Sequence, residues 1–295
     1  ERLQQFANLQ KPPAVKFKDL EAAVSSKITY NILPMKVRVD YLRMTNTSVL
    51  TNITVLFERR DLQFQNKDGV ERASINLYGR ITNMSRRPIN VFEDPITVEV
   101  PAEFLEEAAK GSSIYGKSIP LAPGMYRLNI VAKDVIGGNM NNYEVALNVP
   151  RFDDETLSSS TLVLADVLQP VPTHDIGAGQ FVVGTMKVRP RVGEAFRSGE
   201  KMGVYVQFYN FAPDEETHKP NGAIQYEVVK DGTNEKVIDF TEDLSAIDGA
   251  SPTQVTVEKL LPLASLGAGR YNLQVTAIDR SPDMRVSTSS AFTVF

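Results

Sequence analysis

The chain contains one short phrase twice, and this repetition constrains the fold more than any other feature. The first copy reads LAPGMYRLNIVAKD over 121–134, and the second reads GAGRYNLQVTAID over 267–279. Aligning Gly124 with Gly269 brings like residues together at every second position: Tyr126 with Tyr271, Leu128 with Leu273, Ile130 with Val275, Ala132 with Ala277 and Asp134 with Asp279. A period of two puts all of them on one face of a β-strand. The repeat therefore predicts a shared core, and hence a fold that occurs twice.

The tyrosine two residues after the glycine predicts a specific local structure. In immunoglobulin-like sandwiches, a tyrosine corner packs its ring inward and bonds its hydroxyl to the backbone a few residues upstream. We expect Tyr126 and Tyr271 to form such corners. The alternative is an ordinary hairpin with an exposed tyrosine. A weaker match, of the segments 77–83 and 204–210, gives a second sign of duplication.

Short alternating runs separated by turn residues fill most of the chain, which is typical of antiparallel β-structure. Only 102–110 has helical spacing. The fold class expected is all-β, with two tandem immunoglobulin-like antiparallel β-sandwich domains and an extended N-terminal arm. The expected boundaries are an arm over 1–27, a first sandwich over 28–151, a patternless linker over 152–160 and a second sandwich over 161–295.

Composition excludes several classes of protein. The chain has no cysteine, so disulfides, thiol nucleophiles and thiolate metal sites are impossible within it. A cysteine-free secreted β-protein is more typical of bacteria than of eukaryotes. A net charge of -4 gives no general attraction to nucleic acid, so we expect no nucleic-acid partner. No apolar run is long enough to predict a transmembrane helix, so we expect no membrane insertion. No charged-then-apolar leader follows Glu1, so a signal peptide is expected to have been removed or never to have belonged here.

Three segments carry a family resemblance: YGRITNMSRRPINVFED, SIPLAPGMYRLNIVAKDVIGGNMNNYEVALNVPRF and DGTNEKV. With them the chain resembles the C-terminal region of bacterial GWxTD-domain-containing proteins over nearly all of 12–295. The motif that names the family is absent, since the chain has no tryptophan. The resemblance implies an exported bacterial protein located in the periplasm, on the cell surface or outside the cell, and it transfers no catalytic residue.

Catalytic and cofactor motifs are not found in the sequence. The two histidines, His174 and His218, lie in separate loops about 44 positions apart, and no nucleophile elbow, HExxH or phosphate loop occurs. The glycines near 177–179 precede a strand rather than a helix, which argues against phosphate binding. We therefore expect no enzyme, no catalytic residue and no cofactor.

Two acidic clusters are the only candidates for a metal site. They are Asp153-Asp154-Glu155 at the expected linker and Asp214-Glu215-Glu216 with His218. Calcium needs six to eight oxygen ligands, and neither cluster has EF-hand spacing. Solvated acidic loops are the favoured interpretation, so no metal site is predicted, while calcium at the domain junction stays open.

Two surfaces are candidates for binding. If Val204, Val206 and Phe208 face the core, then Tyr205 and Tyr209 face outward with Phe211 just beyond, and such rings suit a protein partner or a sugar. The alternative is that these rings pack under the 213–220 loop or against the other domain. A basic segment is formed by Lys187, Arg189, Arg191, Arg197 and Lys201, and it is read as a solvated strand edge or a site for an acidic polymer.

Three functions remain open on the sequence. The first is a non-catalytic interaction or spacer module that works through sandwich loops and edges. The second is a structural subunit of an extracellular or envelope polymer, in which the arm or the terminal strand AFTVF adds to a neighbour's sheet. The third is an accessory region of an upstream enzyme. The partner is expected to be a protein or another copy of the chain, with polysaccharide as a further candidate.

Overall fold

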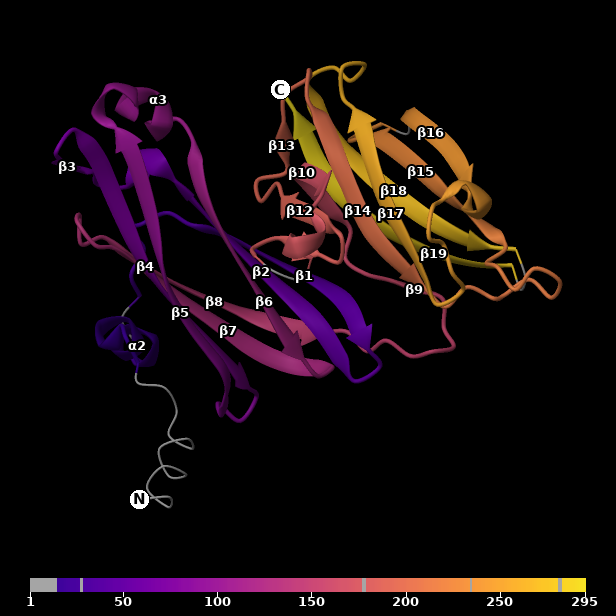
Figure 1. Cartoon of the computed structure of the whole chain (residues 1–295), viewed down its shortest axis with the longest axis horizontal. Coiled ribbons are helices and arrows are strands. Elements are labelled where there is room, and N and C mark those ends of the chain that lie inside the picture. The colour runs from indigo at the N-terminus through magenta and orange to yellow at the C-terminus, as the bar shows by residue number, and fades with distance from the viewer. Residues whose placement is uncertain (1–14, 27–28, 177–178, 234, 281–282) are drawn as a thin grey trace. The chain divides into compact units, whose positions relative to one another are not determined.

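The protein is built almost entirely from antiparallel β-sheets, which confirms the predicted all-β class. A computed structural model describes residues 15–26, 29–176, 179–233, 235–280 and 283–295 (Figure 1). One strand pair, β13 with β19, is parallel. The short helical segment expected over 102–110 is present as a 3₁₀ turn, η2 (Ala102–Phe104), followed by α3 (Leu105–Ala109).

The N-terminal half contributes the first set of strands. They are β1 (Lys36–Thr45), β2 (Ser48–Glu58), β3 (Gln65–Lys67), β4 (Val70–Asn83), β5 (Pro88–Pro101), β6 (Ser112–Leu121), β7 (Gly124–Asp134) and β8 (Met140–Val149), with helix α2 (Lys18–Ser25) before them and the 3₁₀ turn η1 (Arg59–Asp61) after β2. One sheet has the order β1-β2-β6. The other has the order β3-β4-β7-β8, and β5 pairs with the free side of β4.

The C-terminal half repeats this arrangement with short additions. Its elements are β9 (Ser158–Ser159), β10 (Val163–Pro170), η3 (Thr173–Asp175), β11 (Val182–Val183), β12 (Met186–Pro190), β13 (Ala195–Phe196), β14 (Lys201–Tyr209), β15 (Gly222–Lys230), β16 (Lys236–Asp243), η4 (Leu244–Ala246), β17 (Gln254–Pro262), β18 (Gly269–Asp279) and β19 (Met284–Val294). One sheet has the order β11-β12-β10-β14-β17, with β9 on β14. The other has the order β13-β19-β18-β15-β16.

The strand orders explain the repeated phrase. The order β1-β2-β6 corresponds to β10-β14-β17, and β5-β4-β7-β8 corresponds to β16-β15-β18-β19. The two copies of the phrase are β7 and β18, which hold the same place in equivalent sheets. The second match proposed from the sequence is wrong, because it aligned β4 with β14. The equivalent of β4 is β15, and β14 is the equivalent of β2.

The chain divides into two compact units that are discontinuous in sequence. Unit 1 comprises Glu1–Met35, Leu56–Ser113 and Met125–Asn148; unit 2 comprises Lys36–Val55, Ile114–Gly124 and Val149–Phe295. Most of β1, β2 and β6 therefore belongs to unit 2. The division into consecutive domains over 28–151 and 161–295 stays a prediction. Within unit 2, a single apolar core that includes Val206, Tyr226 and Val275 joins the two sheets of the C-terminal half face to face.

The predicted N-terminal arm is wrong in one respect, because Lys18–Ser25 forms helix α2. Residues 1–14 and 27–28 of that arm lie outside the described residues. Leu20 and Ala23 pack on the outer face of β4 and β7, against Tyr78 and Val131, and all four are buried. The side chain of Glu93 accepts bonds from the backbone N–H groups of 16 and 17, at 2.8 and 3.0 Å, and so anchors the start of the helix.

Candidate functional site

The aromatic stripe proposed for partner binding is buried. Tyr205, Tyr209 and Phe211 are 2%, 0% and 3% exposed, so the expectation of an exposed binding stripe is wrong. Phe211 belongs to the core of unit 2. The physical reason is that β1 supplies Leu42, which packs with Tyr205 over the outer face of β14.

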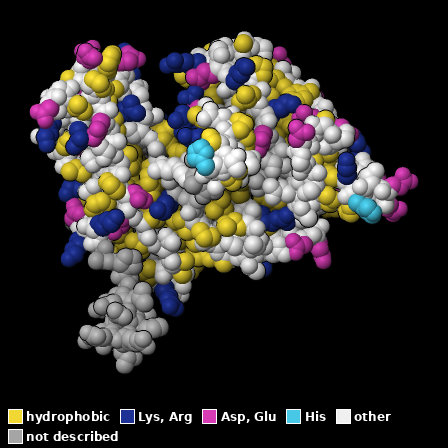
Figure 2. Space-filling view, viewed as in Figure 1, with side chains coloured by type: hydrophobic (Ala, Val, Ile, Leu, Met, Phe, Trp, Pro, Cys, Tyr) yellow, Lys and Arg dark blue, Asp and Glu magenta, His cyan; other side chains and the backbone are white. Residues whose placement is uncertain are grey.

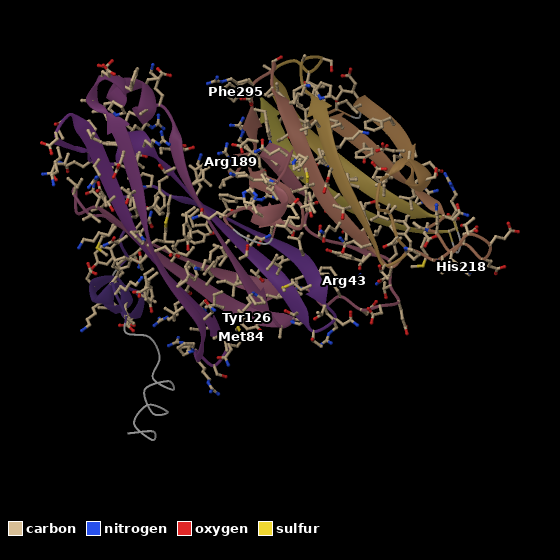
Figure 3. All side chains as sticks on the ribbon, viewed as in Figure 1. Arg43, Met84, Tyr126, Arg189, His218 and Phe295 are labelled. Atoms are coloured by element: carbon tan, nitrogen blue, oxygen red, sulfur yellow. The ribbon has the colours of Figure 1, made fainter. Side chains whose placement is uncertain are left out.

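A complete hydrogen-bond chain accompanies this burial. The side-chain amide of Gln207 donates to the Tyr205 hydroxyl at 2.7 Å, and the Tyr209 hydroxyl donates to the Gln207 side-chain oxygen at 2.7 Å. The backbone N–H of Arg43 donates to the Tyr209 oxygen at 3.0 Å, and the guanidinium of Arg43 lies 4.3 Å from the ring centre (Figure 3). Burial raises the pKa of Tyr209 to about 12. Gln207, on the same face as both rings, was the overlooked sign of an internal network.

The two acidic clusters form turns of the same kind. The Asp153 carboxylate accepts the backbone N–H of Thr156 at 2.6 Å, and the Asp214 carboxylate accepts that of Thr217 at 2.9 Å. These N–H donations hold the pKa of both aspartates below their usual range. The shared motif Asp-x-x-Thr is the sequence signal for these turns. Among the described residues, no three His, Asp or Glu side chains converge in a way that could hold a metal ion.

The 213–220 loop is a closed hairpin rather than a loose excursion. Pro213 and Pro220 form an antiparallel bridge, and the backbone N–H of Asp214 donates to the Lys219 carbonyl at 2.8 Å. His218, at the tip, has a positive φ of 55° and is labelled in Figure 3. His174 lies in η3, well separated in sequence, and no described cluster contains both histidines.

This hairpin forms one wall of a groove on unit 2, which has a volume of about 460 Å³. The 243–250 segment forms the opposite wall. The polar lining residues are Asp214, Thr217, Lys219, Asn221, Asp243, Ser245 and Asp248. Three carboxylates line the groove against one lysine, and Arg280 pairs with one of the three, so a net negative charge remains that favours a cationic occupant.

Two of these carboxylates have different roles. Asp243 accepts the backbone N–H of Ser245 at 3.0 Å and pairs with Arg280 at 2.8 Å. The Ser245 bonds, followed by Arg280, lower the pKa of Asp243 to about 2, so this carboxylate is a fixed structural charge. Asp248 is exposed and, within the described part of the chain, has no hydrogen-bond or ion-pair partner.

A second groove of about 210 Å³ lies on the other side of the same segment, and Asp248 lines both. Its floor holds Tyr226, whose ring stacks on Phe240 with centres 4.6 Å apart. Lys259 pairs with Glu242 at 3.0 Å beside these rings. The 243–250 segment is therefore a ridge between two polar grooves.

Two of the five residues of the basic segment form ion pairs within unit 2. Arg189, labelled in Figure 3, pairs with Asp166 at 2.6 Å, and Arg191 pairs with Glu200 while its guanidinium lies 4.9 Å from the Phe196 ring centre. These pairs leave less positive charge than the sequence suggested. The segment is therefore better described as a strand edge held by ion pairs than as a binding site for an anion.

One buried ion pair also has a structural role. Arg38 makes two-pronged contact with Asp40, which is 1% exposed, and it also bonds Glu194 and the Leu162 carbonyl. Burial raises the pKa of Asp40 even though Arg38 opposes that shift. The cavity beside it measures about 30 Å³, enough for about one water molecule and too small for a substrate.

The repeated phrase forms the corner that was predicted for its second copy. The Tyr271 hydroxyl donates to the Gly267 carbonyl at 2.8 Å, and its ring is buried on Phe292 with centres 5.5 Å apart. Tyr126 is half-buried, and its corner stays a prediction. The matched glycines agree closely, with φ of 152° at Gly124 and 159° at Gly269, values that residues with a side chain rarely adopt.

No protein-family model matches the chain, and no curated protein matches it. None of the described helices is long and apolar enough to span a membrane. The geometry of the grooves and of the sheet edges is therefore the basis for a functional assignment.

Proposed function

We propose that the chain is a non-catalytic interaction module, and that it binds a cationic segment of a protein partner in the groove between the 213–220 hairpin and the 243–250 ridge. The observation that carries the proposal is the open, acidic groove of about 460 Å³ at the loop end of unit 2. Loops at the ends of a sandwich are where this fold class usually carries recognition.

The groove is preorganised, which favours binding. Hydrogen bonds within the hairpin and the Asp243–Ser245 turn fix both walls, so little order has to be gained when a partner arrives. Asp248 supplies an unpaired carboxylate on the rim. A lysine or arginine of the partner would gain a charge-assisted bond there.

The use of the acidic and basic side chains supports a non-catalytic role. Asp153, Asp214 and Asp243 cap turns, and Asp40 is held by Arg38. A general acid or base needs a proton-transfer group facing a cleft that is large enough for a substrate. In the groove, Asp214 and Asp243 accept bonds from backbone N–H groups, and Asp248 is the carboxylate of its lining that has no partner among the described residues.

The setting of this module is proposed from the sequence. The resemblance to GWxTD-domain-containing proteins and the absence of cysteine support an exported bacterial protein, in the periplasm, on the cell surface or outside the cell. An accessory role beside an upstream enzyme is compatible with the same groove. A polysaccharide is a weaker candidate partner, because the aromatic stripe that suggested it was expected to be exposed and is buried.

Polymer formation by donation of the terminal strand receives no support. All but the last residue of AFTVF belongs to β19, which pairs along its whole length with β18 in its own sheet. Its end also pairs with β13, and the N–H of Phe295 donates to the Phe196 carbonyl at 3.0 Å. Donating this strand to a neighbour would break these bonds and expose Phe292, which is buried.

Peptide selection tests the groove directly. Phage-displayed random peptides are selected on the whole chain, and the enriched peptides are titrated by calorimetry. We expect Lys- or Arg-rich peptides whose affinity falls at least about tenfold in the Asp248→Lys variant. The control is Glu235→Lys, an equal charge change at an exposed position outside the groove lining. Enriched peptides that bind Asp248→Lys as well as wild type, or no enrichment, would contradict the proposal.

A further inference from the structure

Strand β5 joins two ends of unit 1 that carry opposite charge. At its start, the β4–β5 turn presents Arg86 and Arg87 in solvent, and within the described part of the chain neither guanidinium has an ion-pair partner. Exposed apolar side chains flank them: Met84 is 61% exposed and Ile89 is 46% exposed. We call this surface the basic tip.

The basic tip is held in one conformation. The Asn83 side-chain oxygen accepts the Arg87 N–H at 2.9 Å, and Arg86 has a positive φ of 63°. The register of β4 with β7 pairs Asn83 with Tyr126, so its continuation brings Met125, 58% exposed, beside Met84. Figure 3 labels Met84 and Tyr126 at this end of the sheet. Two exposed methionines next to two unpaired arginines form an apolar and cationic contact surface.

The other end of β5 has the complementary character. After Pro101 the chain forms η2 and α3, where Phe104 is 56% exposed. Glu103 and Glu106 lie beside it, and among the described residues neither has an ion-pair partner. The N–H of Ala102 donates to the Gly69 carbonyl at 3.0 Å, which fixes this acidic end to the β3–β4 hairpin.

Figure 1 shows α3 at one end of β5 and the β4–β5 turn at the other, and Figure 2 shows acidic side chains gathered at the α3 end. Strand β5 has 14 residues, so the two ends lie about 45 Å apart. One copy of unit 1 therefore cannot bring its own basic tip to its own acidic end.

We infer that copies of this chain associate head to tail, with the basic tip of one copy on the acidic end of the next. Arg86 and Arg87 would meet Glu103 and Glu106, while Met84 and Met125 would cover Phe104. Each contact leaves one tip and one acidic end free, so the assembly is open-ended. This inference uses no strand exchange and does not depend on the groove of unit 2.

The contact involves few side chains, so we expect weak association that depends on ionic strength. Interfaces of this size lie below those of permanent complexes. Charges that meet at an exposed surface are screened over about 8 Å at physiological salt. We therefore expect longer assemblies at low salt and high protein concentration.

Sedimentation velocity of the whole chain tests the inference through charge exchange. The variant Arg86→Glu/Arg87→Glu has two acidic ends, and the variant Glu103→Lys/Glu106→Lys has two basic ends. We expect each alone to self-associate at least about tenfold more weakly than wild type, and an equimolar mixture of the two to recover assembly. Circular dichroism checks that both variants are folded, and Lys201→Glu/Arg285→Glu supplies an equal charge change on unit 2.

The opposing outcomes are distinct. Wild type that stays monomeric at high concentration and low salt overturns the inference, as does a mixture that fails to assemble. Loss of binding to phosphatidylglycerol vesicles in Arg86→Glu/Arg87→Glu, with a monomeric wild type, would assign the basic tip to a lipid surface instead. Peptide binding at Asp248 is measured separately, so failure of one proposal leaves the other standing.

Discussion

The sheets β5-β4-β7-β8 and β16-β15-β18-β19 have the same strand order, but the outer face is apolar in the first and polar in the second at equivalent positions. In the first, Tyr78 lies across from Val131, and in the second the equivalent pair is Gln225 and Thr276. The apolar pair is buried by helix α2. The polar pair is instead bonded within its own sheet, since Thr276 meets Ser287 at 2.8 Å and Gln225 donates to Asp239 at 3.2 Å. The apolar pair thus goes with a covering helix, whereas the polar pair goes with hydrogen bonds inside the sheet.

The inner faces of these two sheets solve one packing problem in two ways. Across β4 and β5, Gly79 faces Phe92, and a Cβ on that glycine would lie 2.0 Å from the ring of Phe92. Across β15 and β16, the equivalent residues are Tyr226 and Phe240, whose rings stack. The first sheet uses one aromatic ring folded over a glycine and the second uses two. The two copies therefore keep a phenylalanine on the neighbouring strand, Phe92 or Phe240, while the residue opposite it changes from glycine to tyrosine.

The largest expected effect comes from removing the ring over Gly79. Phe92 is 5% exposed, so Phe92→Ala should lower the free energy of unfolding by about 3–5 kcal/mol. Phe240 is only partly buried, and Phe240→Ala should cost about 1–2 kcal/mol because Tyr226 still fills the site. Guanidinium denaturation followed by circular dichroism measures both. Equal losses would mean that the two inner faces are not packed differently.

The next effect separates the outer faces. Leu20 is fully buried on Tyr78, so Leu20→Ala should cost about 2–5 kcal/mol and should speed hydrogen exchange throughout α2. The matched change on the polar sheet, Gln225→Ala, should alter stability by less than about 0.5 kcal/mol. Rapid exchange of α2 in the wild-type protein would contradict the covering role of the helix.

The sequence predicted the fold correctly where a contact is local or where apolar residues alternate at every second position. The alternation in β7 and β18 identified the equivalent strands because a core face retains its apolar residues. The equivalence of β4 and β15 was missed because their inner faces differ where they correspond: Gly79 of β4 takes the place that Tyr226 has in β15. A local sequence alignment therefore matched β4 to β14, whose residues are more similar to those of β4 than the residues of β15 are.

Long-range coverage was the other obstacle. Nothing near Lys18–Ser25 indicates that its helix is anchored by Glu93, more than 70 residues away. The burial of Tyr205 depends on Leu42, from a strand more than 150 residues earlier. The acidic groove likewise needs the 213–220 hairpin and the 243–250 ridge together. The spacing of residues within one segment does not indicate which distant segments will pack against it.

The matched aspartates should show equal effects in both sheets. Asp134 accepts the backbone N–H of Gln63 at 2.9 Å, and Asp279 accepts that of Ala212 at 2.7 Å. Both carboxylates are buried, and each ties the end of its strand to a connecting loop. Asp134→Ala and Asp279→Ala should each cost about 1–3 kcal/mol, because a buried donor loses its acceptor. Asp248→Ala, at an exposed position, is the control, and a large difference between the two buried sites would break the equivalence.

The smallest effect concerns the tyrosine hydroxyl at the corner. Tyr271→Phe keeps the ring on Phe292 and removes only the bond to the Gly267 carbonyl, so it should cost about 1 kcal/mol. Tyr126→Phe should cost the same if the first copy of the phrase forms the same corner, since Gly124 and Gly269 share one unusual φ. Denaturant midpoints at constant m-value resolve a difference of this size. A neutral Tyr126→Phe beside a costly Tyr271→Phe would mean that duplication preserved the strand and its glycine while the corner bond survived in one copy alone.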